Sequence, residues 1–422
     1  MAGTPISVPV HDREMRRTAI LALFSASAVF AGDWLQWRGP HNNGVADGAA
    51  PTEWSDSKNV AWKVPIAGRG FSTPVVAGKR IFLTTAIPKT DAASEHKFVV
   101  MALDRDTGKV QWEKTAIEAV PHERYHARYG SYASYAPITD GKHIWAHFGS
   151  WGLYCYDMEG NLVWKKELPK MRMKMAFGEG GAPVLAGDRL ILALDQESGS
   201  IIVALDKNSG KELWRKERSE MSSWSTPLVV NDQVIVSATN KVRAYDLASG
   251  DVVWECGGLG MNVIPAPVVA DGLVIVMSGF RSPNLLAIKL GRKGDLTGTD
   301  AVVWTNQRGN SYTAAPVLHA GTLYNITDNG MVNAVRAADG EVYYRQQRLP
   351  KVYNLKASPV AANGKLYLAT EEGDVVIVKL GEKFEVLATN TLTDQFFVAS
   401  PVIVDGSLYL RSATDLYCIK FR

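Results

Sequence analysis

The chain has 422 residues, of which 46% are hydrophobic and 21% are charged, and its formal net charge is +3. This composition is typical of a soluble globular protein with ample material for a large core. The nearly balanced charge argues against nucleic acid or an anionic membrane surface as the partner.

Residues 1–31 have the pattern of a secretory signal peptide. Arg16 and Arg17 precede the uncharged apolar stretch Ala19–Phe30, and the small residues around Ala31 predict cleavage after that residue. The stretch is too short to span a bilayer as a stable helix, and the alternative interpretation is a buried helix. We therefore expect a bacterial periplasmic or secreted protein without a transmembrane segment.

Two details refine this N-terminus. Met15 comes directly before the two arginines, so residues 1–14 could be an over-extended gene start. Gly32 and Asp33 follow the predicted cleavage site, and the absence of a cysteine there argues against a bacterial lipoprotein anchor.

An N-terminal segment, residues 32–58, precedes a repeat that occupies residues 59–422. Each repeat unit begins with a small residue and a proline followed by aliphatic residues. The eight prolines are Pro74, Pro137, Pro183, Pro227, Pro267, Pro316, Pro359 and Pro401. Their spacings have a median of 44 residues, which matches the four-stranded blade of a β-propeller.

The remainder of each unit alternates apolar and polar residues and contains turn residues at regular places. The third strand ends near an aspartate, and a tight turn such as Asn208-Ser209-Gly210 follows, in which glycine supplies a positive φ. The fourth strand is expected to end in an aromatic residue. The pattern predicts an all-β, eight-bladed propeller with four antiparallel strands in each blade.

The two ends of the repeat complete each other. The last unit, from Pro401 to Arg422, has only three strands, whereas Asn59–Val64 is a fourth strand without a blade. We expect this N-terminal strand to complete the last blade, because closure removes the strand edges that invite aggregation.

Tryptophans recur in the fourth strands, at Trp62, Trp112, Trp164, Trp214, Trp254 and Trp304. Packed between neighbouring blades, each would bury a large apolar area and contribute a few kcal/mol. The alternative, a stacking platform for nucleic acid, is disfavoured because basic residues are not interleaved with them. We assign these tryptophans a docking role within a monomer.

The unit Ala-Leu-Asp-x-x-(Thr/Ser)-Gly-Lys-x-x-Trp, present at residues 102–112 and 204–214, resembles that of the exported PQQ-like, or quinoprotein-type, propeller family. The segment Asp33–Pro40 is similar to the opening of such proteins. The resemblance implies two branches. One holds dehydrogenases that bind pyrroloquinoline quinone (PQQ) and calcium in the central funnel. The other holds non-enzymatic propellers such as the scaffold of the outer-membrane β-barrel assembly machine.

This chain departs from the dehydrogenase branch. Its three cysteines, Cys155, Cys256 and Cys418, include no adjacent pair and are interpreted as buried core residues, with at least one free thiol. No constellation of calcium ligands and no haem motif is evident. We therefore predict no catalytic residues, no metal site and no cofactor, although PQQ with calcium remains the alternative.

Two segments interrupt the repeat. The first, residues 115–135, concentrates histidine, arginine and tyrosine and could bind an anionic or sugar-like ligand, or could be a solvated loop between blades. Its candidate residues are His122, Arg124, Tyr125, His126, Arg128 and Tyr132. The second, Lys170–Gly181, is basic and rich in methionine, and is interpreted as a protein-binding loop or an ordinary connection.

The sequence favours a non-catalytic binding or scaffold protein with a protein or glycan partner. Two alternatives stay open: a PQQ-dependent oxidoreductase and a carbohydrate-binding propeller. The repeat and the export signal carry the first interpretation, the family resemblance carries the second, and residues 115–135 carry the third.

Overall fold

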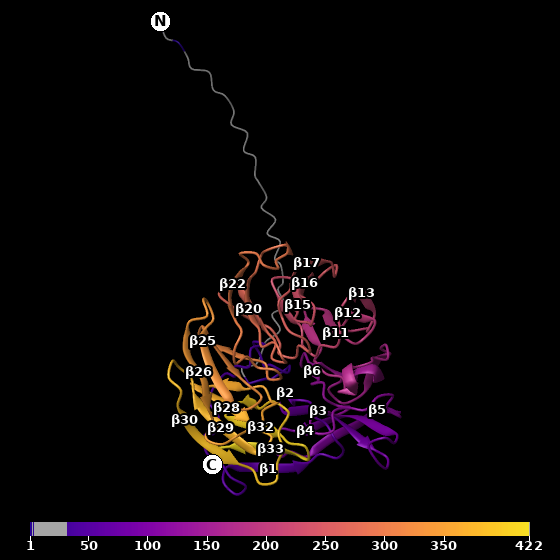
Figure 1. Ribbon diagram of the computed structural model, residues 1–422. Helices are drawn as coiled ribbons and strands as arrows, with labels where there is room; N and C mark the ends of the chain where they lie inside the picture. The colour runs from indigo at the N-terminus through magenta and orange to yellow at the C-terminus, as the bar shows by residue number, and fades with distance from the viewer. Residues whose placement is uncertain (2, 4–31, 422) are drawn as a thin grey trace. The chain divides into compact units, whose positions relative to one another are not determined.

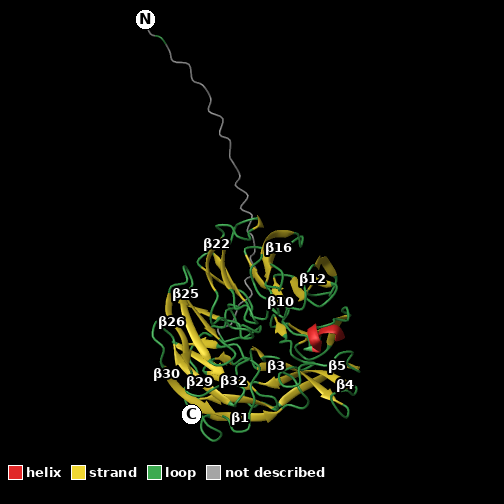
Figure 2. Cartoon of the chain, viewed as in Figure 1, coloured by secondary structure: helices red, strands yellow, loops and turns green. Residues whose placement is uncertain are grey.

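A computed structural model describes residues 1, 3 and 32–421 and confirms an all-β, eight-bladed propeller of four-stranded antiparallel blades. The predicted signal peptide lies almost entirely outside the described residues. Figure 2 shows how nearly all of the described chain is strand or loop. The helical exceptions are two single 3-10 turns, η1 (Gly149–Trp151) and η2 (Lys174–Ala176).

In blades 1 to 7 the strands follow the chain from the inner to the outer edge, whereas the outermost strand of blade 8 is β1 (Figure 1). Blade 1 has β2 (Val75–Ala77), β3 (Arg80–Pro88), β4 (His96–Asp104) and β5 (Val110–Ala119); blade 2 has β6 (Ile138–Thr139), β7 (His143–His147), β8 (Leu153–Asp157) and β9 (Leu162–Lys166). Blade 3 has β10 (Val184–Ala186), β11 (Arg189–Leu194), β12 (Ser200–Asp206) and β13 (Glu212–Arg218); blade 4 has β14 (Leu228–Val230), β15 (Gln233–Val236), β16 (Val242–Asp246) and β17 (Val252–Cys256).

The second half of the ring repeats this order. Blade 5 has β18 (Val268–Ala270), β19 (Leu273–Met277), β20 (Leu285–Lys289) and β22 (Val302–Asn306); blade 6 has β23 (Val317–His319), β24 (Thr322–Ile326), β25 (Met331–Arg336) and β26 (Val342–Arg348). Blade 7 has β27 (Val360–Ala362), β28 (Lys365–Ala369), β29 (Asp374–Lys379) and β30 (Val386–Thr391); blade 8 has β31 (Val402–Val404), β32 (Ser407–Arg411), β33 (Asp415–Lys420) and β1 (Val60–Pro65). The short β21 (Gly294–Asp295) pairs in parallel with β17 as a fifth strand of blade 4.

Each of the eight recurring prolines lies directly before an innermost strand. Proline has no amide hydrogen to donate, so it suits this position outside the ladder of strand hydrogen bonds. The inner strands are short, and β2, for example, is buried throughout and pairs with β3 over Val75–Ala77. The eight proline-marked segments therefore surround the axis of the ring.

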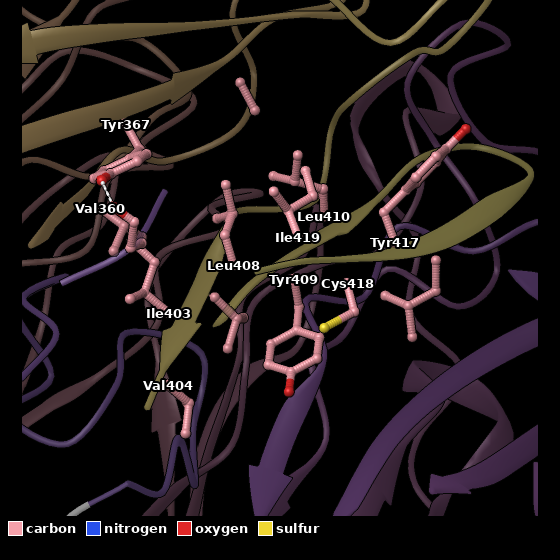
Figure 3. Close-up of a cluster of buried hydrophobic side chains, with 14 of the residues drawn as sticks. Val360, Tyr367, Ile403, Val404, Leu408, Tyr409, Leu410, Tyr417, Cys418 and Ile419 are labelled. Atoms are coloured by element: carbon pink, nitrogen blue, oxygen red, sulfur yellow. Dashed lines mark hydrogen bonds between the residues drawn. The ribbon is translucent and has the colours of Figure 1, made fainter. Parts of the chain in front are cut away.

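Blade 8 contains strands from both ends of the described chain. β1 pairs antiparallel with β33, in a register that includes Val64 opposite Leu416. Figure 3 shows buried side chains of blades 7 and 8, with Tyr409 and Cys418 lying close together on adjacent strands of blade 8. The apolar face of the blade joins those of blades 1 and 7 in one core cluster.

The aromatic residue of the repeat lies near the start of the fourth strand, not at its end as the sequence suggested. Trp112 is the third residue of β5, and Trp214 is the third residue of β13. The strands continue beyond the tryptophan because the third strand still offers partners; Val99, for instance, pairs with Thr115.

The N-terminal segment lies inside the ring against the inner strands. Trp34 exchanges backbone hydrogen bonds with Val76 of blade 1, and Gly44 accepts one from Ala361 of blade 7. The buried Arg38 donates to the carbonyl oxygens of Pro316 and Pro359, which begin blades 6 and 7. This segment therefore crosses the channel at the level of the inner strands.

The three cysteines are buried and unpaired. Burial raises the pKa of Cys155 to about 12 and of Cys256 and Cys418 to about 11. Over the described part of the chain, no helix has the length and apolarity needed to cross a membrane.

Candidate ligand-binding funnel

A cavity of about 730 Å³ lies at the end of the channel where the inner strands begin. Every blade contributes a lining residue one or three positions before its recurring proline. These residues are Phe71, Thr73, Ser134, Ala136, Gly180, Ala182, Trp224, Thr226, Ile264, Thr313, Lys356, Ser358, Val398 and Ser400. The geometry of the repeat therefore gathers residues that are far apart in the sequence around one axis.

The N-terminal segment closes the inner end of this cavity. Trp37 is the residue of this segment that lines the cavity, and its indole Nε1 donates to Ser400 Oγ over 3.3 Å. The neighbouring Arg38 guanidinium lies 5.6 Å from the Trp37 ring centroid. The cavity is thus a funnel with a tryptophan at its base and not an open channel.

Both segments that interrupt the repeat reach the funnel. From residues 115–135, His126 and Tyr129 line the cavity, and their rings stack with centroids 3.8 Å apart. Burial lowers the pKa of His126, and the charge of Lys356 lowers it further. From the methionine-rich loop, Lys174, Met175 and Phe177 line the cavity, and the amide of His126 donates to Phe177 O over 3.0 Å.

The methionine-rich loop, Lys170–Gly181, is fixed by hydrogen bonds from several blades. Trp224 Nε1 donates to Gly178 O over 2.8 Å, and the amide of Met173 donates to Glu123 Oε2 over 2.9 Å. Glu179 accepts hydrogen bonds from the amide and hydroxyl of Ser150. The Met175 side chain is nevertheless 73% exposed, which places it at the open end of the funnel.

Carboxylates near the funnel are paired. Lys356 Nζ lies 2.8 Å from Asp328 Oδ2 and 3.6 Å from Glu371 Oε1, and Arg128 Nε lies 2.7 Å from Glu371 Oε2. Asp328 Oδ1 also accepts a hydrogen bond from Thr313 Oγ1. These pairs tie blade 6 to blade 7 and to residues 115–135.

The six candidate residues of 115–135 do not form one site. His126 alone lines the funnel, whereas His122 and Arg124 border a small adjacent pocket of about 20 Å³. Tyr125 lines a third pocket of about 260 Å³, and Tyr132 lines both lesser pockets.

Several contacts in this segment are structural. His122 Nε2 lies 2.7 Å from Met171 O, and the Tyr132 hydroxyl donates to Glu123 O. Arg128 forms its ion pair with Glu371 of blade 7.

Sequence reasoning missed much of the funnel wall. Phe280 and Arg281 lie in the loop between β19 and β20 of blade 5, Tyr312 lies in the connection between blades 5 and 6, and none of the three carries a motif. Trp224 and Lys356 could have been found, because each stands three residues before a recurring proline, as do wall residues of other blades.

Five of the six docking tryptophans donate the indole hydrogen to a carbonyl oxygen of the next blade. Trp164 Nε1, for example, lies 3.0 Å from Lys207 O, at the turn that contains Gly210. Trp254 differs, since its indole donates to Gln233 Oε1 of its own blade while its ring remains in the core shared by blades 4 and 5. The pattern places these tryptophans in the joints between blades and away from the funnel.

The family model described as "Outer membrane protein assembly factor BamB" matches residues 24–177, 151–380 and 291–420. The chain belongs to this BamB family. The BamB of Yersinia pestis is 22% identical over 340 residues, covering 76% of this chain and 79% of that protein. The BamB of Moranella endobia is 28% identical over 207 residues, and the BamB of Francisella salina is 38% identical over 96 residues. The chain spans 50% of the M. endobia protein and 17% of the F. salina protein in these alignments.

Solved structures share the propeller with this BamB family member. BamB from Moraxella catarrhalis superposes with a TM-score of 0.60 at 14% identity, covering 86% of this chain and 97% of that one. A europium-containing methanol dehydrogenase superposes with a TM-score of 0.65 at 11% identity, covering 92% and 98%. At these identities the likeness concerns the fold alone.

Proposed function

We propose that this protein is a non-catalytic scaffold of the bacterial cell envelope that takes part in outer-membrane protein assembly. The observation that carries the proposal is the BamB family match, which extends over almost the whole propeller. Its partners on this proposal are proteins, and its place is the periplasm or the periplasmic face of the outer membrane.

The chemistry of the funnel supports a non-catalytic role. Calcium takes six to eight oxygen ligands, and the PQQ enzymes hold the quinone together with that ion. Two carboxylates line the funnel, and both have protein partners. Asp328 forms an ion pair with Lys356 and accepts a hydrogen bond from Thr313. Glu179 accepts a hydrogen bond from Ser150. Within residues 32–421 no group of three or more histidine, cysteine, aspartate or glutamate side chains converges on a metal position. These features support a funnel that works without a calcium–quinone pair.

The use of the aromatic residues supports the same role. The indoles of the docking tryptophans are occupied at the joints between blades, where each bonds a carbonyl or amide oxygen. A rigid ring built in this way presents loops and strand edges at fixed positions, as a scaffold requires.

The experiment is a deletion of the gene in its host, followed by quantification of folded outer-membrane β-barrel proteins in envelope fractions. We expect a reduced amount of folded barrel proteins, restored by the wild-type gene. An unchanged barrel content would overturn the proposal. Turnover of alcohols or sugars by the purified protein, with PQQ, calcium and an electron acceptor added, would overturn its non-catalytic part.

A further inference from the structure

We propose that the funnel is a metal-free binding site for a small amphiphilic carboxylate, with the apolar body among the aromatic side chains and the carboxylate on unpaired cations. This inference does not rest on the role in outer-membrane assembly. A cavity of about 730 Å³ has the size of a typical small-molecule site.

The charges that face the cavity favour an anion. Lys174 and Arg281 line the funnel, and neither side chain has an ion pair with any described residue. The carboxylates of Asp328 and Glu179 already accept hydrogen bonds from protein donors. An incoming anion would therefore meet two free cations and no free carboxylate.

Two buried guanidinium groups add positive potential behind the wall. Arg38 and Arg411 are each 1% exposed, and their hydrogen-bond partners are carbonyl and hydroxyl oxygens without any carboxylate. Arg38 is adjacent in sequence to Trp37 at the base of the funnel, and Arg411 contacts Ser72 between two wall residues.

Both guanidinium groups remain charged under physiological conditions. Burial lowers the pKa of each to about 9, which keeps both cationic at neutral pH. A buried charge without a counter-ion is costly, and an anion in the funnel would reduce that cost.

The wall indicates an apolar body. Trp37, Trp224, Phe177, Phe280 and Tyr312 line the cavity. Arg281 lies 5.2 Å from the Phe280 ring centroid, so a cation and an aromatic face are presented together. A chain or ring that fills this space would gain roughly 25 cal/mol for each Å² of apolar surface it buries.

The hydroxyl groups of the wall are less available, which disfavours a neutral sugar. Ser400 N donates to Thr73 Oγ1, Ser358 N donates to Ser400 Oγ, and Ala182 N donates to Thr226 Oγ1. These bonds join neighbouring blades around the funnel. A sugar would need several free polar partners, whereas a carboxylate with an apolar body needs mainly cations and apolar walls.

The test is calorimetric titration of the purified mature protein with decanoate below its micelle concentration, and separately with decyltrimethylammonium. The two probes share the ten-carbon chain and differ in the sign of the charge. We expect saturable binding of decanoate to one site, and binding of the cation at least about tenfold weaker because it lacks the charge-assisted contacts.

Variants locate the site. Lys174→Gln combined with Arg281→Asn removes both free cations, and asparagine tolerates the positive φ of 57° found at Arg281. We expect at least about tenfold weaker decanoate binding by this double variant, with an unchanged far-UV spectrum and thermal midpoint. The matched control is Lys142→Gln, at an exposed lysine in the turn between β6 and β7, which should bind like the wild type.

Three results would overturn the inference. They are no binding of decanoate, equal binding of both probes, and equal loss in the Lys142→Gln control. The outer-membrane phenotype of a gene deletion is a separate measurement, so either proposal can fail while the other stands.

Discussion

The joint between blades 2 and 3 allows a quantitative test of how the tryptophans hold the ring. Gly210 has a φ of 68°, and a Cβ placed on it would lie 2.7 Å from the ring of Trp164. Gly187, in the same blade, has a similar φ of 62° but no atom within 4 Å of such a Cβ. The two glycines therefore share the backbone requirement and differ in the tryptophan contact.

Replacing each glycine by alanine separates the two effects. Gly187→Ala should cost about 1–2 kcal/mol, the penalty for a side chain in the left-handed region. Gly210→Ala should cost the same amount plus about 1–3 kcal/mol for overpacking against the indole. The measurement is the free energy of unfolding from urea denaturation, with the slope m monitored for each variant.

A double-mutant cycle sharpens the test. In the background of Trp164→Leu the space above Gly210 is freed, and Gly210→Ala should then cost no more than Gly187→Ala. Equal costs of the two glycine substitutions in the wild-type background would refute the argument that the tryptophan closes on the glycine.

Three further predictions concern buried polar groups. Burial lowers the pKa of His147 from 6.5 to about 3, so below pH 6.5 the unfolded chain takes up a proton that the folded protein does not. Between pH 7 and pH 5 the wild type should therefore lose about 2 kcal/mol more unfolding free energy than His147→Gln. Identical pH dependence of the two urea midpoints would contradict this. Asp195→Asn should cost about 3–5 kcal/mol in urea denaturation, because Arg218 Nε lies 2.6 Å from Asp195 Oδ1 in a buried pair, whereas Asp195→Leu with Arg218→Met should cost less. The three buried cysteines should resist a thiol reagent in the folded protein at pH 8 and all react in denaturant, and rapid labelling of the folded protein would show that a thiol is accessible.

The propeller could be predicted from the sequence because its determinants are local and repeated. Three local signals recur in a fixed order along the chain. They are a proline before each inner strand, a glycine in the turn before the fourth strand, and a tryptophan near the start of that strand. Each has a conformational reason that holds within one unit. Repetition then supplies the number of blades without any knowledge of long-range contacts.

The funnel could not be predicted in the same way. Its wall combines unlike residues, such as Phe71, Gly180 and Trp224, that share only a place relative to a proline. Residues 115–135 were identified as a cluster by composition, but their side chains diverge into three pockets because backbone carbonyls and Glu371 hold several of them. The base of the funnel comes from residues before the repeat, for which the sequence indicated no role.

The joining of both ends of the described chain inside one ring has a consequence for the order in which the protein folds during synthesis. Ser72 and its partner Arg411 are 339 residues apart in the sequence, and Arg38 and its partner Pro359 are 321 residues apart. These buried arginine contacts therefore cannot form until the last blades have been synthesised, and contacts of such long sequence separation form slowly. Until then the strand β1 lacks its partner β33, so this protein has a long interval in which protection by other proteins would matter.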